Sequence, residues 1–188
     1  LSDLARNIAV QIITPESFKL FFGGPKERRK FIDLGMFHVK HDFSKQWKDF
    51  SRVLKQRNAC IRQANDYSSL EYWTNTFCDL STSVASIRGE YVQNLVDELN
   101  DWLKILLPDL VDRVNVQYLQ GWSQSKPLNE VLANNTEREK SYGYSLYGAH
   151  KFDVKFLLGK QIIDTQLSRG QQKLFLLALT FAQAKLIS

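Results

Sequence analysis

Two long helices are the first prediction from the pattern of apolar and polar residues. In the first, apolar residues recur every three, four or seven positions, which places them on one face of a helix. Those residues are Phe43, Trp47, Phe50, Leu54 and Ile61. After a polar break at 65–69, a second series with spacings of three and four occupies 77–106 and stops before Pro108. Two such helices joined by a short link should fold back into an antiparallel hairpin and bury their apolar faces together.

Shorter elements are predicted on either side of this hairpin. Residues 8–13 are apolar and mostly β-branched, which indicates a buried strand that ends at Thr14-Pro15. A short helix is expected through 16–22, and Pro25 is well placed to begin another helix that runs to about Phe37. Beyond Pro108 the pattern predicts strands at 111–118, 142–146 and 152–158, and helices at 128–140 and from about Ser168 onward.

Charge is distributed unevenly over the two hairpin helices. The segment from Lys19 to Arg62 holds 12 Lys/Arg against 4 Asp/Glu, whereas the segment from Asp66 to Asp112 holds 2 against 9. Opposite charges can simply flank the seam between two helices and set their register. Alternatively, the basic segment is a surface that follows the phosphates of a nucleic acid. The pattern alone leaves both interpretations open.

Composition favours a globular protein with a sizeable core. Hydrophobic residues make up 44% of the 188, the net charge is +5, and the longest apolar runs are far shorter than the roughly 20 residues of a membrane span.

Cys60 and Cys78 cannot build the disulfide framework of a small secreted protein, so we expect reduced thiols in a cytosolic protein. His38 and His41 lie three apart, but no carboxylate or thiol cluster completes a metal site. The chain starts without an initiator Met, and we expect both of its ends to lie within a longer protein.

The stretch 167–173, with the sequence LSRGQQK, is the most informative part of the chain about function. Ser168 is suited to cap the last predicted helix, because its hydroxyl can accept from a free backbone N–H. Gly170 permits a close approach of a ligand to the backbone. The start of a helix adds N–H donors and the positive end of the helix dipole, which together favour an anion such as phosphate. The residues alone therefore indicate a capped helix, with a phosphate site as the alternative.

The same stretch resembles the signature sequence of ABC-type ATPases, usually written LSGGQ, in the LSRGQ form of the RecF family. Three further blocks resemble that family in the same order along the chain. They are ITPESFKLFFGGPKERRKFIDLG at 13–35, LKQRN at 54–58 and YGAHKFDV at 147–154. Four blocks in the right order at the right separations make the resemblance specific, and it extends over nearly the whole chain.

The resemblance implies a fold and a nucleotide site. The fold would be α/β, a partial ABC-type P-loop ATPase head with an inserted helical lid that forms an antiparallel helical-hairpin arm. ATP would be sandwiched between two protomers arranged head to tail, and the signature of one chain would cap the γ-phosphate held by the other. The signature residues are Ser168, Arg169, Gly170 and Gln171. Arg169 replaces the small glycine of the common signature, so it would either add positive charge near the triphosphate or face solvent.

The resemblance also implies a domain plan, cofactors and partners. Residues 1–40 would end the first lobe of the head, 41–110 would form the lid hairpin, and 111–188 would return to the head and carry the signature helix. ATP and Mg²⁺ are implied for the full-length protein, whose ATP-dependent homodimer would bind DNA at junctions between single and double strands. RecR and RecO would be its partners in loading RecA during gap repair, in the bacterial cytoplasm at the nucleoid. The rival interpretation is a non-catalytic interaction module that docks through the helical hairpin.

The catalytic parts of such an ATPase are missing from these 188 residues. No G-x-x-x-x-G-K-[ST] phosphate loop occurs, and no apolar strand that ends in paired acidic residues follows the signature. We therefore predict no catalytic residue in this chain. The chain alone should neither bind ATP and Mg²⁺ nor hydrolyse ATP.

Five basic residues are candidates for contact with DNA phosphates, namely Lys26, Arg28, Arg29, Lys55 and Arg57. Arg28 and Arg29 could instead brace their own helix through Glu27 or Asp33. Lys55 and Arg57 could simply be solvated. No recognition-helix motif occurs, so any DNA contact is expected to involve the backbone rather than base edges.

Overall fold

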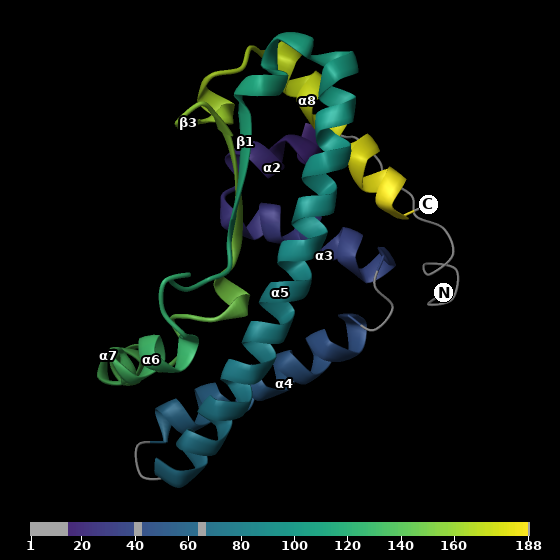
Figure 1. Ribbon diagram of the computed structural model, residues 1–188. Helices are drawn as coiled ribbons and strands as arrows, with labels where there is room; N and C mark the ends of the chain where they lie inside the picture. Colours follow the sequence, from purple (N-terminus) through teal and green to yellow (C-terminus); the bar gives the residue numbers. More distant parts are fainter. Residues whose placement is uncertain (1–14, 40–42, 64–66, 188) are drawn as a thin grey trace. The chain divides into compact units, whose positions relative to one another are not determined.

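The computed structural model describes residues 15–39, 43–63 and 67–187 (Figure 1). The chain divides into two compact units, each assembled from separate stretches of sequence. Unit 1 comprises Leu1–His41, Glu90–Tyr118 and Val154–Ser188, and unit 2 comprises Asp42–Gly89 and Leu119–Asp153. The strand predicted at 8–13 lies outside the described residues.

Unit 2 is built around an antiparallel pair of helices, α4 (Phe43–Arg62) and the first part of α5 (Tyr67–Leu106) (Figure 1). The ring of Phe50 on α4 lies 5.6 Å from that of Phe77 on α5. Earlier in α4, the ring of Trp47 lies 4.9 Å from the guanidinium of Arg88, which comes later in α5. The two helices therefore run in opposite directions, as the apolar spacing predicts, although α5 begins at Tyr67, before the first residue of the predicted series.

A buried arginine completes the aromatic core of unit 2. Arg88 is fully buried, and its guanidinium carbon lies 3.9 Å from the centroid of the Phe152 ring. One of its nitrogens donates to the carbonyl of Ala149 at 2.7 Å. Cation–π attraction and this hydrogen bond compensate part of the cost of removing the charge from water. Arg88 thus ties α5 to the 149–152 segment.

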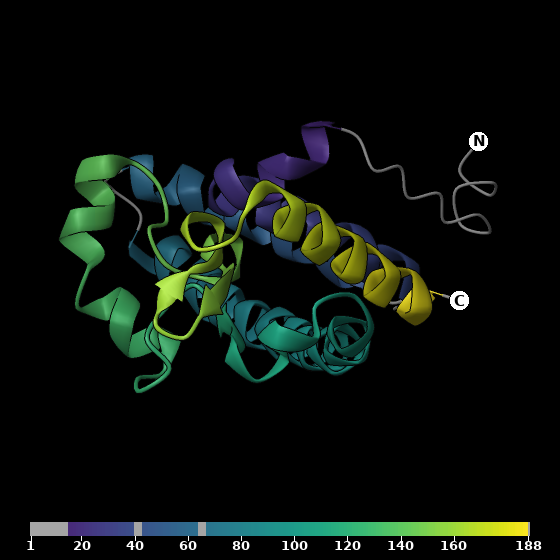
Figure 2. The ribbon, with the colours of Figure 1, turned by 90° about the horizontal axis from the view of Figure 1, so that it is seen from above.

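Unit 1 is built around α8 (Arg169–Ile187), which packs against α3 (Pro25–Val39) (Figure 2). A one-turn 3-10 helix, η1 (Pro15–Phe18), and the short α2 (Lys19–Phe22) precede α3. The buried Phe175 of α8 lies 5.8 Å from the Phe21 ring and 5.7 Å from the Phe156 ring. The helices predicted at 16–22, from Pro25 and from Ser168 are thereby confirmed.

A buried glutamine, Gln183, connects three helices of unit 1 by hydrogen bonds. Gln183 of α8 is fully buried, and its amide donates to the Phe31 carbonyl of α3 at 2.9 Å and to the Tyr91 hydroxyl of α5 at 3.0 Å. Gly35 makes room for this arrangement, because a Cβ atom there would collide with the Tyr91 hydroxyl. The close approach of α3 and α5 thus depends on a residue without a side chain.

A small sheet has the strand order β1-β2-β3. Its strands are β1 (Val114–Leu119), β2 (Asp153–Leu158) and β3 (Gln161–Ile162). β2 and β3 are antiparallel, with Leu157 opposite Ile162, and Gly159 turns between them at φ +64°. The strands predicted at 111–118 and 152–158 are therefore present. The first starts late, because the 3-10 helix η2 (Pro108–Arg113) occupies its beginning.

Two predicted elements between the strands are corrected by the structure. The helix predicted at 128–140 is two helices, α6 (Leu128–Ala133) and α7 (Thr136–Tyr142), because the Asn135 side chain bonds the Val131 carbonyl at 2.8 Å where the backbone breaks. The strand predicted at 142–146 is wrong. Gly143 takes the left-handed conformation (φ 75°) that ends α7, and side-chain hydrogen bonds rather than a strand partner hold the residues after it. A one-turn 3-10 helix, η3 (Ala149–Lys151), then leads into β2, and another, η4 (Ile163–Thr165), follows β3.

Candidate functional sites

The start of α8 is held by two reciprocal side-chain hydrogen bonds. The Gln171 backbone N–H donates to the Ser168 hydroxyl at 3.3 Å, and the Ser168 backbone N–H donates to Oε1 of Gln171 at 3.0 Å. This is a capping box, in which a serine before the first helical residue and a glutamine three residues later satisfy each other's backbone donors. The predicted capping role of Ser168 is confirmed.

The signature residues lie at the surface of unit 1. Ser168, Arg169 and Gly170 are exposed and Gln171 is half-buried. A Cβ atom built on Gly170 would meet no atom within 4 Å. The first turn of α8 is therefore open to a ligand or to another protein surface. Contact of these four residues with nucleotide remains a prediction.

Gln172 supports the same turn and was not singled out from the sequence. Its side chain is buried, and Nε2 donates to the carbonyls of Asp164 at 2.9 Å and Leu167 at 3.2 Å. These bonds fasten the loop before the signature to the first turn of the helix. The signal was present in the spacing, because Gln172 precedes the buried Leu176 by four residues and so lies on the apolar face of α8.

A basic face runs along α4 in unit 2. It consists of Lys45, Lys48, Arg52 and Lys55, which follow one another at intervals of three and four residues and are all exposed. Three of these, together with Trp47, Ser51 and Gln56, line a shallow depression of about 410 Å³. Arg52 pairs with Asp49 at 3.2 Å, and Asp49 is the one acidic residue of α4. The α4 basic face thus presents a net positive charge over a rise of about 15 Å.

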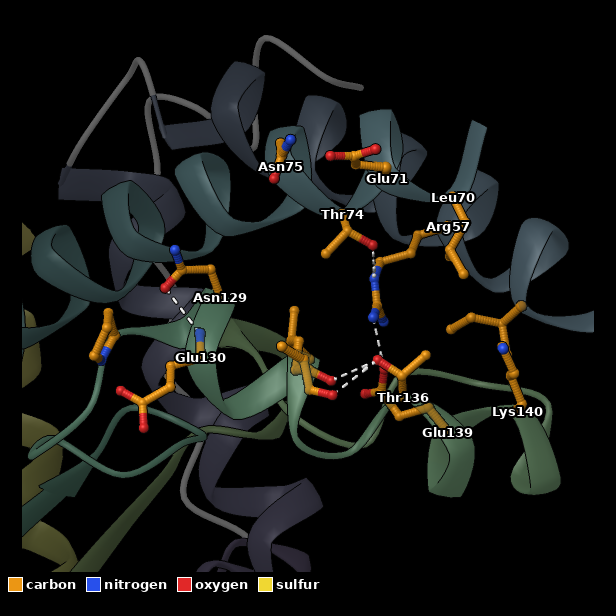
Figure 3. A pocket seen from close by; sticks show the side chains of 14 residues that line it. Arg57, Leu70, Glu71, Thr74, Asn75, Asn129, Glu130, Thr136, Glu139 and Lys140 are labelled. Atoms are coloured by element: carbon orange, nitrogen blue, oxygen red, sulfur yellow. Dashed lines mark hydrogen bonds and ion pairs between the residues drawn. The ribbon is translucent and has the colours of Figure 1, made fainter. Parts of the chain in front are cut away.

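Arg57 does not belong to this face, and its prediction as a DNA contact is corrected. The side chain is buried and forms an ion pair with the equally buried Glu139 of α7 at 2.6 Å (Figure 3). Its other donors reach Thr74 at 3.1 Å and Ser145 at 2.6 Å. An arginine whose donors point into the protein is not available to phosphate. The pair lines a pocket of about 660 Å³ whose walls come from α4, α5, α6 and α7.

Three of the four remaining DNA candidates lie at the start of α3 in unit 1. Lys26 is exposed, whereas Arg28 and Arg29 are half-buried. Glu27, a suggested brace for the arginines, pairs with Lys30 at 3.0 Å, and this bond holds the pKa of the Glu27 carboxyl below its ordinary value. The structure brings Lys26, Arg28 and Arg29 together on one short helix, while Lys55 belongs to the other unit. Their contact with DNA remains a prediction.

The described residues hold neither a cluster of metal ligands nor a helix that could span a membrane. Across 15–39, 43–63 and 67–187, no three His, Cys, Asp or Glu side chains gather closely enough to hold a metal ion. Over the same ranges, no helix is both long and apolar enough to cross a lipid bilayer.

Comparison with solved structures defines the class of fold. The chain matches a structure described as the recombination mediator protein RecF-ATP in the RecFOR pathway, with a TM-score of 0.86 and 17% identity over 97% of the chain and 52% of that protein. A second RecF structure matches with a TM-score of 0.81 and 18% identity over 93% of the chain. The fold is thus that of about half of these RecF structures, mostly helical with a small antiparallel sheet, and the predicted fold class is confirmed.

Comparison with curated sequences finds close relatives over the whole chain. All 188 residues align, at 69% identity, with half of the DNA replication and repair protein RecF of Colwellia psychrerythraea. The RecF proteins of Pseudoalteromonas translucida and Shewanella baltica are each 40% identical over 189 aligned residues. No protein-family model matches the chain. The chain is homologous to these RecF proteins over its whole length and spans about half the length of the curated relatives that it matches.

Proposed function

We propose that this chain is the signature-bearing segment of a RecF-type recombination mediator that closes on ATP as a head-to-tail dimer and holds DNA. Its structural relatives are described as RecF with ATP in the RecFOR pathway, which supports ATP as the nucleotide and RecR and RecO as partners. The whole protein would act at junctions between single- and double-stranded DNA in the bacterial cytoplasm, where it would assist RecA loading. The 188 residues contain no phosphate loop or Mg²⁺-binding acid, so no step of hydrolysis is assigned to them.

Gly170 is the observation that carries the nucleotide part of this proposal. Glycine is a poor helix former, so a glycine within a helix is usually explained by close packing or by a left-handed backbone. Neither explanation applies, because a Cβ atom would meet nothing and Gly170 is not among the glycines with positive φ. A surface outside the chain therefore explains the glycine best. A triphosphate against the helix N-terminus, held by a second protomer, fits this position.

The test is Gly170→Ala in a complete RecF protein that carries this segment, such as the Colwellia psychrerythraea protein with these 188 residues exchanged in. The melting temperature should stay the same or rise, because the added methyl group meets no atom of the chain. ATP-dependent dimerisation, measured by light scattering, should weaken at least about tenfold. Lys160→Ala in the β2–β3 turn is the control and should dimerise normally. Normal ATP-dependent dimerisation of Gly170→Ala would refute the assignment.

The α4 basic face supports the DNA part of the proposal. Its four cations lie opposite the buried Phe50 and Val53, so they face water rather than the α4–α5 seam. A rise of about 15 Å matches roughly four base pairs of duplex at about 3.4 Å each. Contacts of this kind read no sequence and depend on salt, because each neutralised phosphate releases counterions.

The test is duplex binding by the 188-residue chain, measured by fluorescence anisotropy over a salt series. Four phosphate contacts predict a slope of about −3.6 in log K against log salt, or about a 150-fold loss between roughly 50 and 200 mM. Lys48→Gln with Lys55→Gln should halve this slope. The control is Lys104→Gln with Lys126→Gln, two exposed lysines on other helices or loops. Binding that does not respond to salt would instead favour a docking module that uses apolar surface.

A further inference from the structure

A small exposed surface on unit 2 combines two tyrosines with three cations. Tyr142 ends α7 and Tyr144 follows Gly143, and the two residues are 55% and 41% exposed. Their rings meet edge to face, with centroids 6.0 Å apart and planes at 69°. The Arg138 guanidinium lies 5.9 Å from the Tyr142 centroid, and the Lys151 ammonium lies 5.2 Å from the Tyr144 centroid. The third cation, Arg62, donates to the Gly143 carbonyl at 3.3 Å. We call this group the tyrosine platform.

The charge of the tyrosine platform is positive. The two nearest carboxylates on α7 pair with other cations, Glu137 with Lys140 at 2.8 Å and Glu139 with the buried Arg57. Arg62 also stands on α4 two helical turns beyond Lys55, which places it at the end of the α4 basic face, about 10 Å along the helix. The tyrosine platform therefore continues a surface already suited to phosphate.

Part-buried hydrogen bonds hold the residues next to the two tyrosines in place. Asn58 of α4 accepts from the Ser145 backbone at 2.8 Å and from the Ser145 hydroxyl at 2.7 Å. The next residue, Leu146, donates its N–H to Glu139 at 2.8 Å. On the other side of Tyr144, Gly143 closes the C-terminus of α7 in the left-handed conformation. The two exposed rings are thus fixed by the residues that flank them, and binding would cost little ordering entropy.

We propose that the tyrosine platform binds single-stranded nucleic acid, with bases stacked on Tyr142 and Tyr144 and the flanking phosphates held by Arg62, Arg138 and Lys151. Exposed aromatic rings interleaved with cations suit this ligand, because every base offers a flat face and every nucleotide carries a charge. In a duplex those faces are covered by neighbouring base pairs, so the rings distinguish unpaired from paired strands. The proposal rests on the proposed DNA function and adds the residues at which the unpaired strand would bind. A duplex on the α4 basic face and an unpaired strand on the tyrosine platform would together make a junction.

The experiment compares oligo-dT with duplex DNA, measured by anisotropy on the 188-residue chain. Tyr142→Ala with Tyr144→Ala should bind oligo-dT at least about tenfold more weakly, since stacking contributes about 1–3 kcal/mol per base. Tyr142→Phe with Tyr144→Phe keeps both rings and should bind within about twofold of the parent. Tyr72→Ala removes another exposed tyrosine, 63% exposed on α5, and should bind normally. Arg138→Gln should reduce the salt slope for single strands by about 0.7.

The outcomes separate this proposal from the proposed function. Loss of oligo-dT affinity in the alanine pair, with duplex affinity unchanged and rescue by the phenylalanine pair, supports the tyrosine platform. Equal loss for alanine and phenylalanine overturns it, because the hydroxyls and not the ring faces would then carry the contact, as in docking to a protein. Unchanged oligo-dT binding in the alanine pair also overturns the tyrosine platform. In that case, duplex binding that still depends on Lys48 and Lys55 would continue to support the proposed DNA function. A chain that binds neither DNA at low salt overturns both.

Discussion

Replacement of Arg57 should lower the free energy of unfolding of unit 2 far more than replacement of any surface cation. Arg57→Met deletes a guanidinium whose side chain is 3% exposed and leaves Glu139, at 1%, without its cation. Breaking a buried pair from one side costs about 3–5 kcal/mol, because the remaining charge stays in a poorly solvated site. The loss of the hydrogen bonds to Thr74 and Ser145 adds to this cost. With an m-value of about 2 kcal/mol per molar urea, the midpoint should fall by roughly 2 M.

The assay is urea denaturation followed by tryptophan fluorescence, since Trp47, Trp73 and Trp122 all belong to unit 2. Arg52→Met is the matched control on the same helix, because its pair with Asp49 is a surface pair worth at most about 1 kcal/mol. Arg57→Met combined with Glu139→Leu removes both charges and should be more stable than Arg57→Met alone. A loss below about 1 kcal/mol for Arg57→Met, or a double variant less stable than the single one, would refute the reasoning.

Three further predictions concern unit 1 and the hairpin. Gly35→Ala should destabilise the chain by roughly 1–3 kcal/mol in thermal melts, because the new methyl group collides with the Tyr91 hydroxyl. Alanine in place of glycine normally stabilises a helix, so the effect should have the opposite sign to the usual one. The destabilisation should be smaller in a Tyr91→Phe background. Burial raises the pKa of Tyr91 to about 12, so the stability that comes from keeping it neutral is complete below pH 10 and is lost as pH rises towards 12; Tyr91→Phe should make that fall shallower in urea titrations. Burial also raises the pKa of the Cys78 thiol to about 11 from its ordinary 9.0, so at pH 8 iodoacetamide should modify it about tenfold more slowly in the folded chain than in urea, tested in a Cys60→Ser variant. Equal rates in both states would contradict the burial of Cys78.

The helical part of the fold was predictable because its signal is repeated many times. Each turn of α4 and α5 adds an apolar residue to the same face, so a few irregular positions do not obscure the period. The 142–146 segment has no such repetition. Its residues suit a strand, but Gly143 ends α7 and Asn58, from a distant helix, takes the hydrogen bonds that a neighbouring strand would need. Local sequence does not contain a partner that lies 87 residues away.

The buried position of Arg57 follows from the same helical period. The number of cations on α4 does not by itself distinguish a buried cation from an exposed one. Arg57 follows Val53 by four residues and precedes Ile61 by four, and both are buried. Helical geometry alone therefore placed it on the core face. Gln172 and Gln183 on α8 obey the same rule, and each proved to hold backbone carbonyls of other segments. A polar residue in phase with an apolar face predicts a buried hydrogen-bond network, although not the identity of its partners.

The ion pair between Arg57 and Glu139 also affects the point during synthesis at which unit 2 can fold. Its partners are 82 residues apart, and they come from the two separate stretches of unit 2. On the ribosome, the α4–α5 hairpin leaves the exit tunnel before Glu139 and Ser145 do. Until Glu139 is available, Arg57 lies on the core face of the hairpin without the carboxylate that pairs with it, so packing of that face is disfavoured. Synthesis of the second stretch, rather than the speed of helix formation, should therefore set the moment at which unit 2 becomes resistant to proteases.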